Sequence, residues 1–265
     1  MSVLQSIFLG IIQGLSEFLP VSSSGHLIVV RELFGISDTG GLFFDILVHL
    51  GTLLSLIVFL RKEIFKILTN LQDKLNQKLL TNILVASIPA FLAGLLLKGL
   101  VEDRLRNSLL VALFFLITAI FLFVSDVFKV KKITKLSGLN YLDSLIIGSF
   151  QAVALFPGIS RSGSTIFGGI LKGLSRKDSV KFSFFLAIPI ITGAGFFDVL
   201  KVFQDSSNLG ISLPSAFSGF ISAFVFGLFG IYLLKRFVER KSLKVFSFYL
   251  LVLVVVLVVR WYLIL

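Results

Sequence analysis

The chain has 265 residues, a hydrophobic fraction of 56%, a mean hydropathy of +1.02 and a formal net charge of +11. This composition excludes an ordinary soluble domain, and the lack of cysteine excludes a disulfide framework and a thiolate site. The basic residues stand in short stretches between apolar segments, so membrane topology explains the positive charge better than a nucleic-acid partner does.

The chain begins with an apolar segment, residues 1–33, which Pro20 and the run Ser22-Ser23-Ser24-Gly25 interrupt. The interruption predicts a re-entrant helix–loop–helix hairpin rather than one clean transmembrane span. Residues 139–174 predict a second re-entrant hairpin for the same reason. An ordinary transmembrane hairpin is the simpler alternative for both segments.

Six further segments are long and apolar enough to cross a membrane. They cover residues 41–60, 80–98, 108–127, 181–200, 212–234 and 245–265. Residues 62–79 predict an amphipathic helix on the cytoplasmic surface. The predicted fold is therefore an all-α polytopic membrane protein, with six transmembrane helices and two re-entrant hairpins in a single membrane domain over residues 1–265.

Of the 25 Lys and Arg residues, 18 fall in four clusters. The clusters cover residues 61–78, 129–135, 172–181 and 235–244. The positive-inside rule places them on the cytoplasmic side, so that both termini face outward. The two hairpins then enter from opposite faces. Repeat one (1–127) and repeat two (139–265), each a hairpin plus three spans, are predicted to have inverted topology.

The two hairpins share a polar motif. Residues 8–25 and 146–163, aligned without gaps, match at six positions, where background composition gives about one or two. The matches are Gly10/Gly148, Gln13/Gln151, Phe18/Phe156, Ser22/Ser160, Ser24/Ser162 and Gly25/Gly163. Polar groups in hydrocarbon need protein or water around them. The repeat therefore predicts one buried polar site that both halves share.

In each motif a helix breaks at proline and a serine-rich turn opens the next helix. Such a helix start offers free backbone N–H groups, hydroxyl donors and the positive end of the helix dipole, which suit an anion. Two of them facing each other suit a ligand with more than one phosphate. The expected substrate-binding residues are Gln13, Ser22, Ser24, Ser160, Ser162 and Thr165.

Three charged or titratable residues occur in only one of the two motifs. Glu17 could act as general acid or base, or hold a divalent cation. His26 could accept a proton from water or Ser23, or attack phosphorus itself. Arg161 offers a planar fork that matches phosphate oxygens. A structural Glu17–Arg161 ion pair is an alternative that would coexist with a site. His49 and Asp45 are expected to be interfacial and structural.

At these motifs the chain resembles the undecaprenyl-diphosphate phosphatase family, also called the bacitracin-resistance proteins. QGLSEFLPVSSSGH at 13–26 and PGISRSGST at 157–165 carry the resemblance. It implies hydrolysis of the C55 isoprenoid diphosphate to the monophosphate and phosphate, which recycles the lipid carrier of cell-wall synthesis and confers bacitracin resistance. It also implies dependence on a divalent cation, Mg²⁺ or Ca²⁺, and a site open to the outer face of the bacterial inner membrane.

The resemblance assigns catalytic roles to Glu17, Ser23, His26 and Arg161, with Glu17 also as a metal ligand and Thr165 as the last residue of the second motif. Where the family commonly has a first acidic residue, this chain has Gln13, so this helix does not offer a metal ion two carboxylates at these positions. The attacking group stays open between Ser23, His26 and water.

A transporter or flippase for a polyprenyl phosphate lipid is the alternative function, because inverted repeats commonly build carriers. Besides the substrate, the expected partners are membrane lipids. The oligomeric state is left open, with a homodimer as one alternative.

Overall fold

The computed structural model describes residues 1–36, 41–128, 133–204, 210–240 and 242–264. Within these ranges the regular elements are α-helices and one short 3-10 helix, η1 (Leu136–Gly138). The α-helices are α1 (Val3–Phe18), α2 (Ser23–Phe34), α3 (Gly41–Thr69), α4 (Lys74–Arg104), α5 (Ser108–Val127), α6 (Tyr141–Val153), α7 (Arg161–Leu171), α8 (Arg176–Gln204), α9 (Leu213–Arg240) and α10 (Lys244–Ile264). The predicted all-α class is thus confirmed.

Six helices are long and apolar enough to cross a membrane, and they match the six predicted spans. The qualifying stretches are Gly41–Thr69, Lys74–Leu97, Ser108–Val127, Arg176–Leu200, Leu213–Val238 and Lys244–Leu263. The chain is therefore a multi-pass membrane protein. The last residue of the last predicted span, Leu265, lies outside the described residues.

The separate surface helix predicted for residues 62–79 is wrong. Residues up to Thr69 continue α3, and α4 already begins at Lys74. Asp73 explains the division, because its side chain accepts a hydrogen bond from the Leu75 N–H and so caps α4. The polar residues of this stretch thus end one long helix and begin the next.

Both motif segments are broken helices. Helix α1 ends at Phe18, just before Pro20, and the chain passes through Ser22 with φ of 69° before α2 begins. Helix α6 ends at Val153, and the chain turns through Gly158 with φ of 107° before α7 begins. A side chain at Gly158 would meet the Val111 carbonyl oxygen at 2.7 Å. The turn therefore needs glycine both for its positive φ and for the lack of a side chain.

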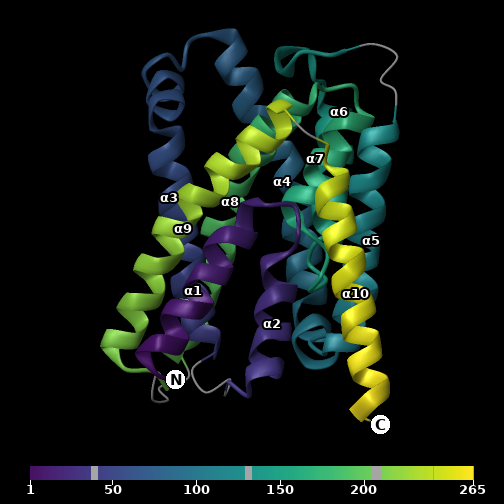
Figure 1. Ribbon diagram of the computed structural model, residues 1–265. Helices are drawn as coiled ribbons and strands as arrows, with labels where there is room; N and C mark the ends of the chain where they lie inside the picture. Colours follow the sequence, from purple (N-terminus) through teal and green to yellow (C-terminus); the bar gives the residue numbers. More distant parts are fainter. Residues whose placement is uncertain (37–40, 129–132, 205–209, 241, 265) are drawn as a thin grey trace.

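The two breaks meet inside the bundle. The Gly158 N–H donates to Ser22 Oγ (3.1 Å), and Ser162 Oγ donates to the Leu19 carbonyl oxygen (3.2 Å). In Figure 1, α1 and α2 rise from the end that holds both termini and return to it, whereas α6 and α7 come from the opposite end. The two short helix pairs are therefore joined turn to turn.

Close helix packing holds each pair in place. Along α1, a side chain at Gly10 would meet the Gly219 carbonyl oxygen of α9 at 2.5 Å, and one at Gly14 would meet the Gly227 N at 2.7 Å. Helix α6 approaches α4 as closely, because a side chain at Gly148 would meet the Ala86 carbonyl oxygen at 2.2 Å. Such backbone contact is typical of helices packed in membranes.

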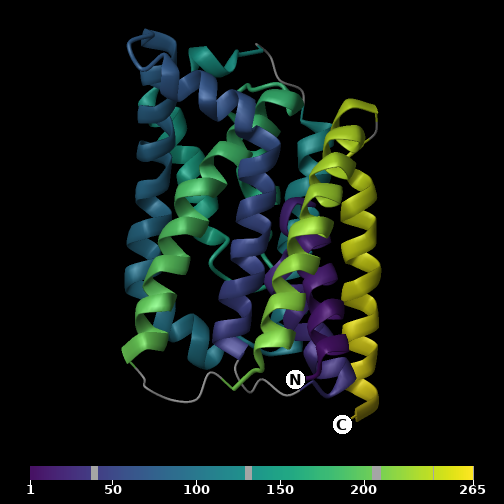
Figure 2. The ribbon, with the colours of Figure 1, turned by 90° about the vertical axis from the view of Figure 1, so that its left-hand side faces the viewer.

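Three connections that lie in the predicted basic clusters, α3–α4, α7–α8 and α9–α10, gather at one end of the bundle (Figure 2). Both termini lie at the other end. Lys78 at the start of α4 donates to the Ser137 carbonyl oxygen of η1 (2.9 Å), which ties the α5–α6 connection to the same end. Part of the predicted cluster 129–135, residues 129–132, lies outside the described residues.

Candidate active site

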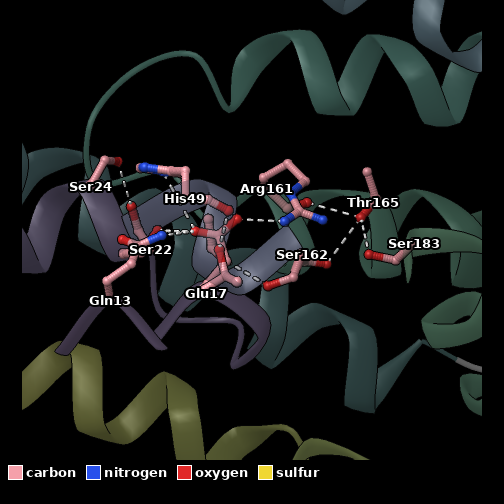
Figure 3. A network of polar contacts seen from close by, with 12 residues as sticks. Gln13, Glu17, Ser22, Ser24, His49, Arg161, Ser162, Thr165 and Ser183 are labelled. Atoms are coloured by element: carbon pink, nitrogen blue, oxygen red, sulfur yellow. Dashed lines mark hydrogen bonds and ion pairs between the residues drawn. The ribbon is translucent and has the colours of Figure 1, made fainter. Parts of the chain in front are cut away.

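Glu17 lies at the centre of a polar network where the two breaks meet (Figure 3). It stands in the last turn of α1 and is only 8% exposed. Its Oε2 accepts hydrogen bonds from Gln13 Nε2, one turn earlier (2.9 Å), and from Ser23 Oγ at the start of α2 (2.5 Å). The first hairpin thus brings its carboxylate, amide and central serine together.

Arg161 joins this network from the second hairpin. It is the first residue of α7, and its Nη2 lies 2.6 Å from Glu17 Oε1. Both side chains are largely buried, with 14% and 7% exposure. The structure therefore brings together Glu17 and Arg161, which are 144 residues apart in the chain. The structural ion pair that the sequence left as an alternative is this same contact.

The hydroxyl groups of the second motif hold the start of α7. Ser160 is the N-cap, because its Oγ accepts the Gly163 N–H (3.1 Å). Thr165 Oγ1 lies 2.9 Å from the Arg161 carbonyl oxygen and 2.7 Å from Ser183 Oγ of α8. With Ser162 bonded to Leu19, these groups fix the backbone from which Arg161 projects. Their binding of substrate stays a prediction.

In the first motif, Ser22 and Ser24 contact each other (Oγ to Oγ, 3.4 Å), and Ser22 Oγ also accepts the N–H of Gly158. The first contact is weak at that distance. Ser22 thus links the two hairpins, whereas Ser24 keeps most of its hydrogen-bonding capacity for other partners. Substrate binding by this pair also stays a prediction.

His26 directs both ring nitrogens away from Glu17. Its Nδ1 lies 2.8 Å from the Ser22 carbonyl oxygen, and its Nε2 lies 2.7 Å from the Tyr249 hydroxyl of α10. The His26 and Tyr249 rings stack at an interplanar angle of 10°. The structure therefore places His26 beside the serine turn, but on the α10 side of it.

His49, which the sequence predicts to be interfacial and structural, lies beside Glu17 in the polar network. It comes from α3, and its Nε2 lies 3.8 Å from Glu17 Oε2 (Figure 3). Its Nδ1 lies 2.7 Å from the Asp45 carbonyl oxygen, so this nitrogen carries the hydrogen and the other one faces the carboxylate. The signal that could have found it is an imidazole within an apolar span, which is costly unless it has a function.

Two cavities flank the network. The larger, about 670 Å³, has Arg161 and Gln151 in its wall and reaches Val101 and Leu200 toward the ends of α4 and α8. Those helix ends lie at the end of the bundle that holds both termini. The smaller, about 360 Å³, lies between α1 and α10 beside His26 and Tyr249. Arg161 therefore contributes to the wall of a mostly apolar cavity.

Glu17 and its neighbours offer too few coordinating atoms to hold a divalent cation alone. They fit such a cation only if a bound phosphorylated ligand supplies further oxygens. Among the described residues, no group of three or more His, Cys, Asp or Glu side chains could hold a metal ion. Glu17 supplies one carboxylate, and His49 stands beside it. One or two carboxylates, with substrate phosphates and water, are the usual ligands of Mg²⁺. The site thus fits a cation that arrives with a phosphorylated ligand.

Six apolar spans around a buried carboxylate–guanidinium pair define a polytopic membrane protein with a polar centre. The model of the family described as bacitracin resistance protein BacA matches residues 6–256. The chain therefore belongs to the BacA family, which confirms the resemblance drawn from the two motifs.

Several curated relatives are similar over nearly their whole length. The undecaprenyl-diphosphatase of Thermosipho melanesiensis is 42% identical over 245 residues, which cover 92% of this chain and 93% of that protein. Undecaprenyl-diphosphatase 4 of Bacillus thuringiensis subsp. konkukian is 41% identical over 249 residues, 94% and 93% of the two chains. The undecaprenyl-diphosphatase of Methanococcus maripaludis is 35% identical over 248 residues, which cover 93% of this chain and 95% of that protein.

Proposed function

We propose that this protein hydrolyses undecaprenyl diphosphate to undecaprenyl phosphate and inorganic phosphate. The observation that carries the proposal is the chain of contacts from Ser23 through Glu17 to Arg161. A hydroxyl, a carboxylate that can take its proton, and a guanidinium that can bind phosphate are the groups that phosphoryl transfer needs. The names of the relatives, which cover this chain almost completely, support the same activity.

In the proposed reaction, a phosphate oxygen of the substrate draws Arg161 from Glu17 and frees the carboxylate. Glu17 takes the proton of Ser23, whose Oγ forms a bond to the terminal phosphorus as the bond to the bridging oxygen breaks. The electron pair leaves with the lipid monophosphate, to which Glu17 passes the proton. Glu17 then takes a proton from water, whose oxygen forms a bond to the phosphorus of the phosphoserine. The Oγ–P bond breaks, inorganic phosphate leaves, and Glu17 returns the proton to Ser23 Oγ. Of the three attacking groups left open by the sequence, the Ser23–Glu17 contact favours Ser23.

We assign supporting roles to the neighbouring residues. Gln13 orients Glu17 through its 2.9 Å hydrogen bond. His26 lies three residues after Ser23 and therefore on the same face of α2, so it can carry protons to the serine turn once its ring leaves Tyr249. Hydroxyl groups of both motifs, including Ser24, bind phosphoryl oxygens at the two helix starts.

A divalent cation, Mg²⁺ or Ca²⁺, would be held by Glu17 and by the diphosphate itself. When bound, it would offset negative charge on the phosphoryl oxygens. His49 stands beside this carboxylate, with its Nε2 3.8 Å from Glu17 Oε2.

The proposed membrane topology follows from the charge distribution. The end with the basic connections faces the cytoplasm, and both termini with the mouth of the larger cavity face the periplasm. The helix pairs α1–α2 and α6–α7 are then re-entrant hairpins from opposite faces, and repeats 1–127 and 139–265 are inverted copies. In the bacterial inner membrane, an outward-facing site would return the lipid carrier to the cell-wall cycle and confer bacitracin resistance.

Phosphate release from purified protein tests the proposal. In detergent, wild type should hydrolyse both undecaprenyl and farnesyl diphosphate, whereas a flippase needs a sealed bilayer to show activity. Ser23→Ala should abolish release, and acid quenching of wild type with ³²P-labelled substrate should leave label on Ser23. Absence of hydrolysis by wild type overturns the proposed function; hydrolysis by Ser23→Ala overturns the role of the serine alone.

A further inference from the structure

Gln151 occupies the position of the second motif that Gln13 occupies in the first, but its surroundings differ. Gln13 Nε2 donates to Glu17 Oε2, one turn later. One turn after Gln151 the chain has Leu155, so the corresponding carboxylate is missing. Gln151 is 2% exposed, and no donor or acceptor in the described part of the chain bonds either of its amide atoms. The described residues therefore supply no hydrogen-bond partner to either amide atom.

The cavity beside Gln151 has the chemistry of such a ligand site. Gln151 and Arg161 stand in the wall of the same 670 Å³ cavity. Arg161 uses Nη2 for Glu17, and within the described ranges its buried Nη1 has no partner. The rest of the wall is largely apolar, with Phe91 and Leu95 of α4 and Pro189 of α8. Polar donors beside an apolar channel suit an anionic headgroup with a long hydrocarbon tail.

We propose that Gln151 is a substrate-binding residue whose Nε2 donates a hydrogen bond to an oxygen of the lipid diphosphate, next to Arg161 Nη1. This inference rests on the proposed function and names a further contact of the same site. A buried amide without partners lowers stability, and a diphosphate oxygen in the adjoining cavity would supply the partner that the described residues do not. The two motifs thus use one shared glutamine differently: the first orients the carboxylate, and the second binds substrate.

Gln151→Leu tests the proposal by separating binding from stability. Loss of a hydrogen bond to a charged phosphate should raise the KM for farnesyl diphosphate about tenfold to a hundredfold, with kcat changed less than threefold. The Tm in detergent should stay the same or rise, because an unpartnered polar group is replaced by an apolar one. A glutamine that only supports the fold would show the reverse, a lower Tm and an unchanged KM.

Asn82→Leu is the matched control. Asn82 is also a buried helical amide, and its Oδ1 has no partner among the described residues, but its Nδ2 donates to the Leu139 carbonyl oxygen (3.3 Å) and it is not part of the cavity wall. This variant should lower Tm and leave KM unchanged. The pair of variants therefore separates a buried amide that binds substrate from one that binds the protein.

Gln151→Glu keeps the test decisive if the leucine variant does not fold. A carboxylate there would repel the diphosphate, so KM should rise above the wild-type value by at least tenfold. A wild-type KM in either folded variant overturns the inference. That result differs from failure of the proposed function itself, in which wild type would release no phosphate from farnesyl diphosphate.

Discussion

The Tyr249 hydroxyl lies 2.7 Å from His26 Nε2 and holds the imidazole away from Glu17. Because His26 Nδ1 lies 2.8 Å from the Ser22 carbonyl oxygen, the neutral ring carries its hydrogen on Nδ1. Nε2 therefore accepts a hydrogen bond from the tyrosine hydroxyl. The pair joins α2 to α10 across 223 residues of sequence. His26 can therefore exchange protons with the site only after it leaves Tyr249.

Tyr249→Phe tests this relationship. The substitution removes the hydroxyl and keeps the ring, so turning of His26 toward Ser23 becomes easier. We expect a kcat for phosphate release within threefold of wild type or above it.

His26→Gln should lower kcat about 100-fold or more, which is the usual loss of rate when a proton-transfer group is removed. Tyr262→Phe, at the exposed C-terminal end of α10, is the control. An equal, large loss in Tyr249→Phe would show instead that the tyrosine positions His26 for reaction.

The Glu17–Arg161 contact allows its structural and chemical roles to be separated. Arg161→Met leaves Glu17 as a buried charge without its partner, which costs about 3–5 kcal/mol of stability. The double variant Glu17→Gln/Arg161→Met removes both charges and should recover most of the lost Tm. Neither variant should release phosphate, because the guanidinium that binds the phosphoryl group is absent from both. Activity in the stable double variant would show that the ion pair has a structural role alone.

The spans and the central pair could be predicted from sequence because each depends on local features. Long apolar runs define the spans, and a proline followed by serines marks each helix break. The comparison of the two motifs also singles out Glu17 and Arg161, because each aligns with an uncharged residue in the other motif. These inferences need no knowledge of which helices pack together.

The orientation of individual side chains could not be predicted, because it depends on helices far apart in the chain. His49 reaches Glu17 only through the packing of α3, and Tyr249 of α10 decides where His26 points. The serines of the second motif show the same limit. The sequence predicts Ser160 as an anion donor but does not show that its oxygen also accepts the Gly163 N–H and so caps α7; substrate binding by its hydroxyl stays a prediction.

The contact of α1 with α9 should make Gly14 intolerant of even a methyl group. In Gly14→Ala, the new Cβ would lie 2.7 Å from the Gly227 backbone N, so the helices must separate. We expect a loss of about 1–3 kcal/mol, seen as a lower Tm in detergent. Gly195→Ala is the matched control in α8, because its nearest neighbour, Leu50, would be 3.7 Å away. This variant should keep or raise Tm, since alanine favours the helix.

The proposed cation should bind together with the substrate rather than before it, because Glu17 is the one carboxylate in the described network. EDTA should abolish phosphate release, and Mg²⁺ or Ca²⁺ should restore it. By linkage, the cation concentration for half-maximal activity should fall as farnesyl diphosphate is raised. His49→Gln should raise that concentration severalfold if the imidazole assists the same ion. A half-maximal concentration that does not change with substrate would indicate a site that the protein forms by itself.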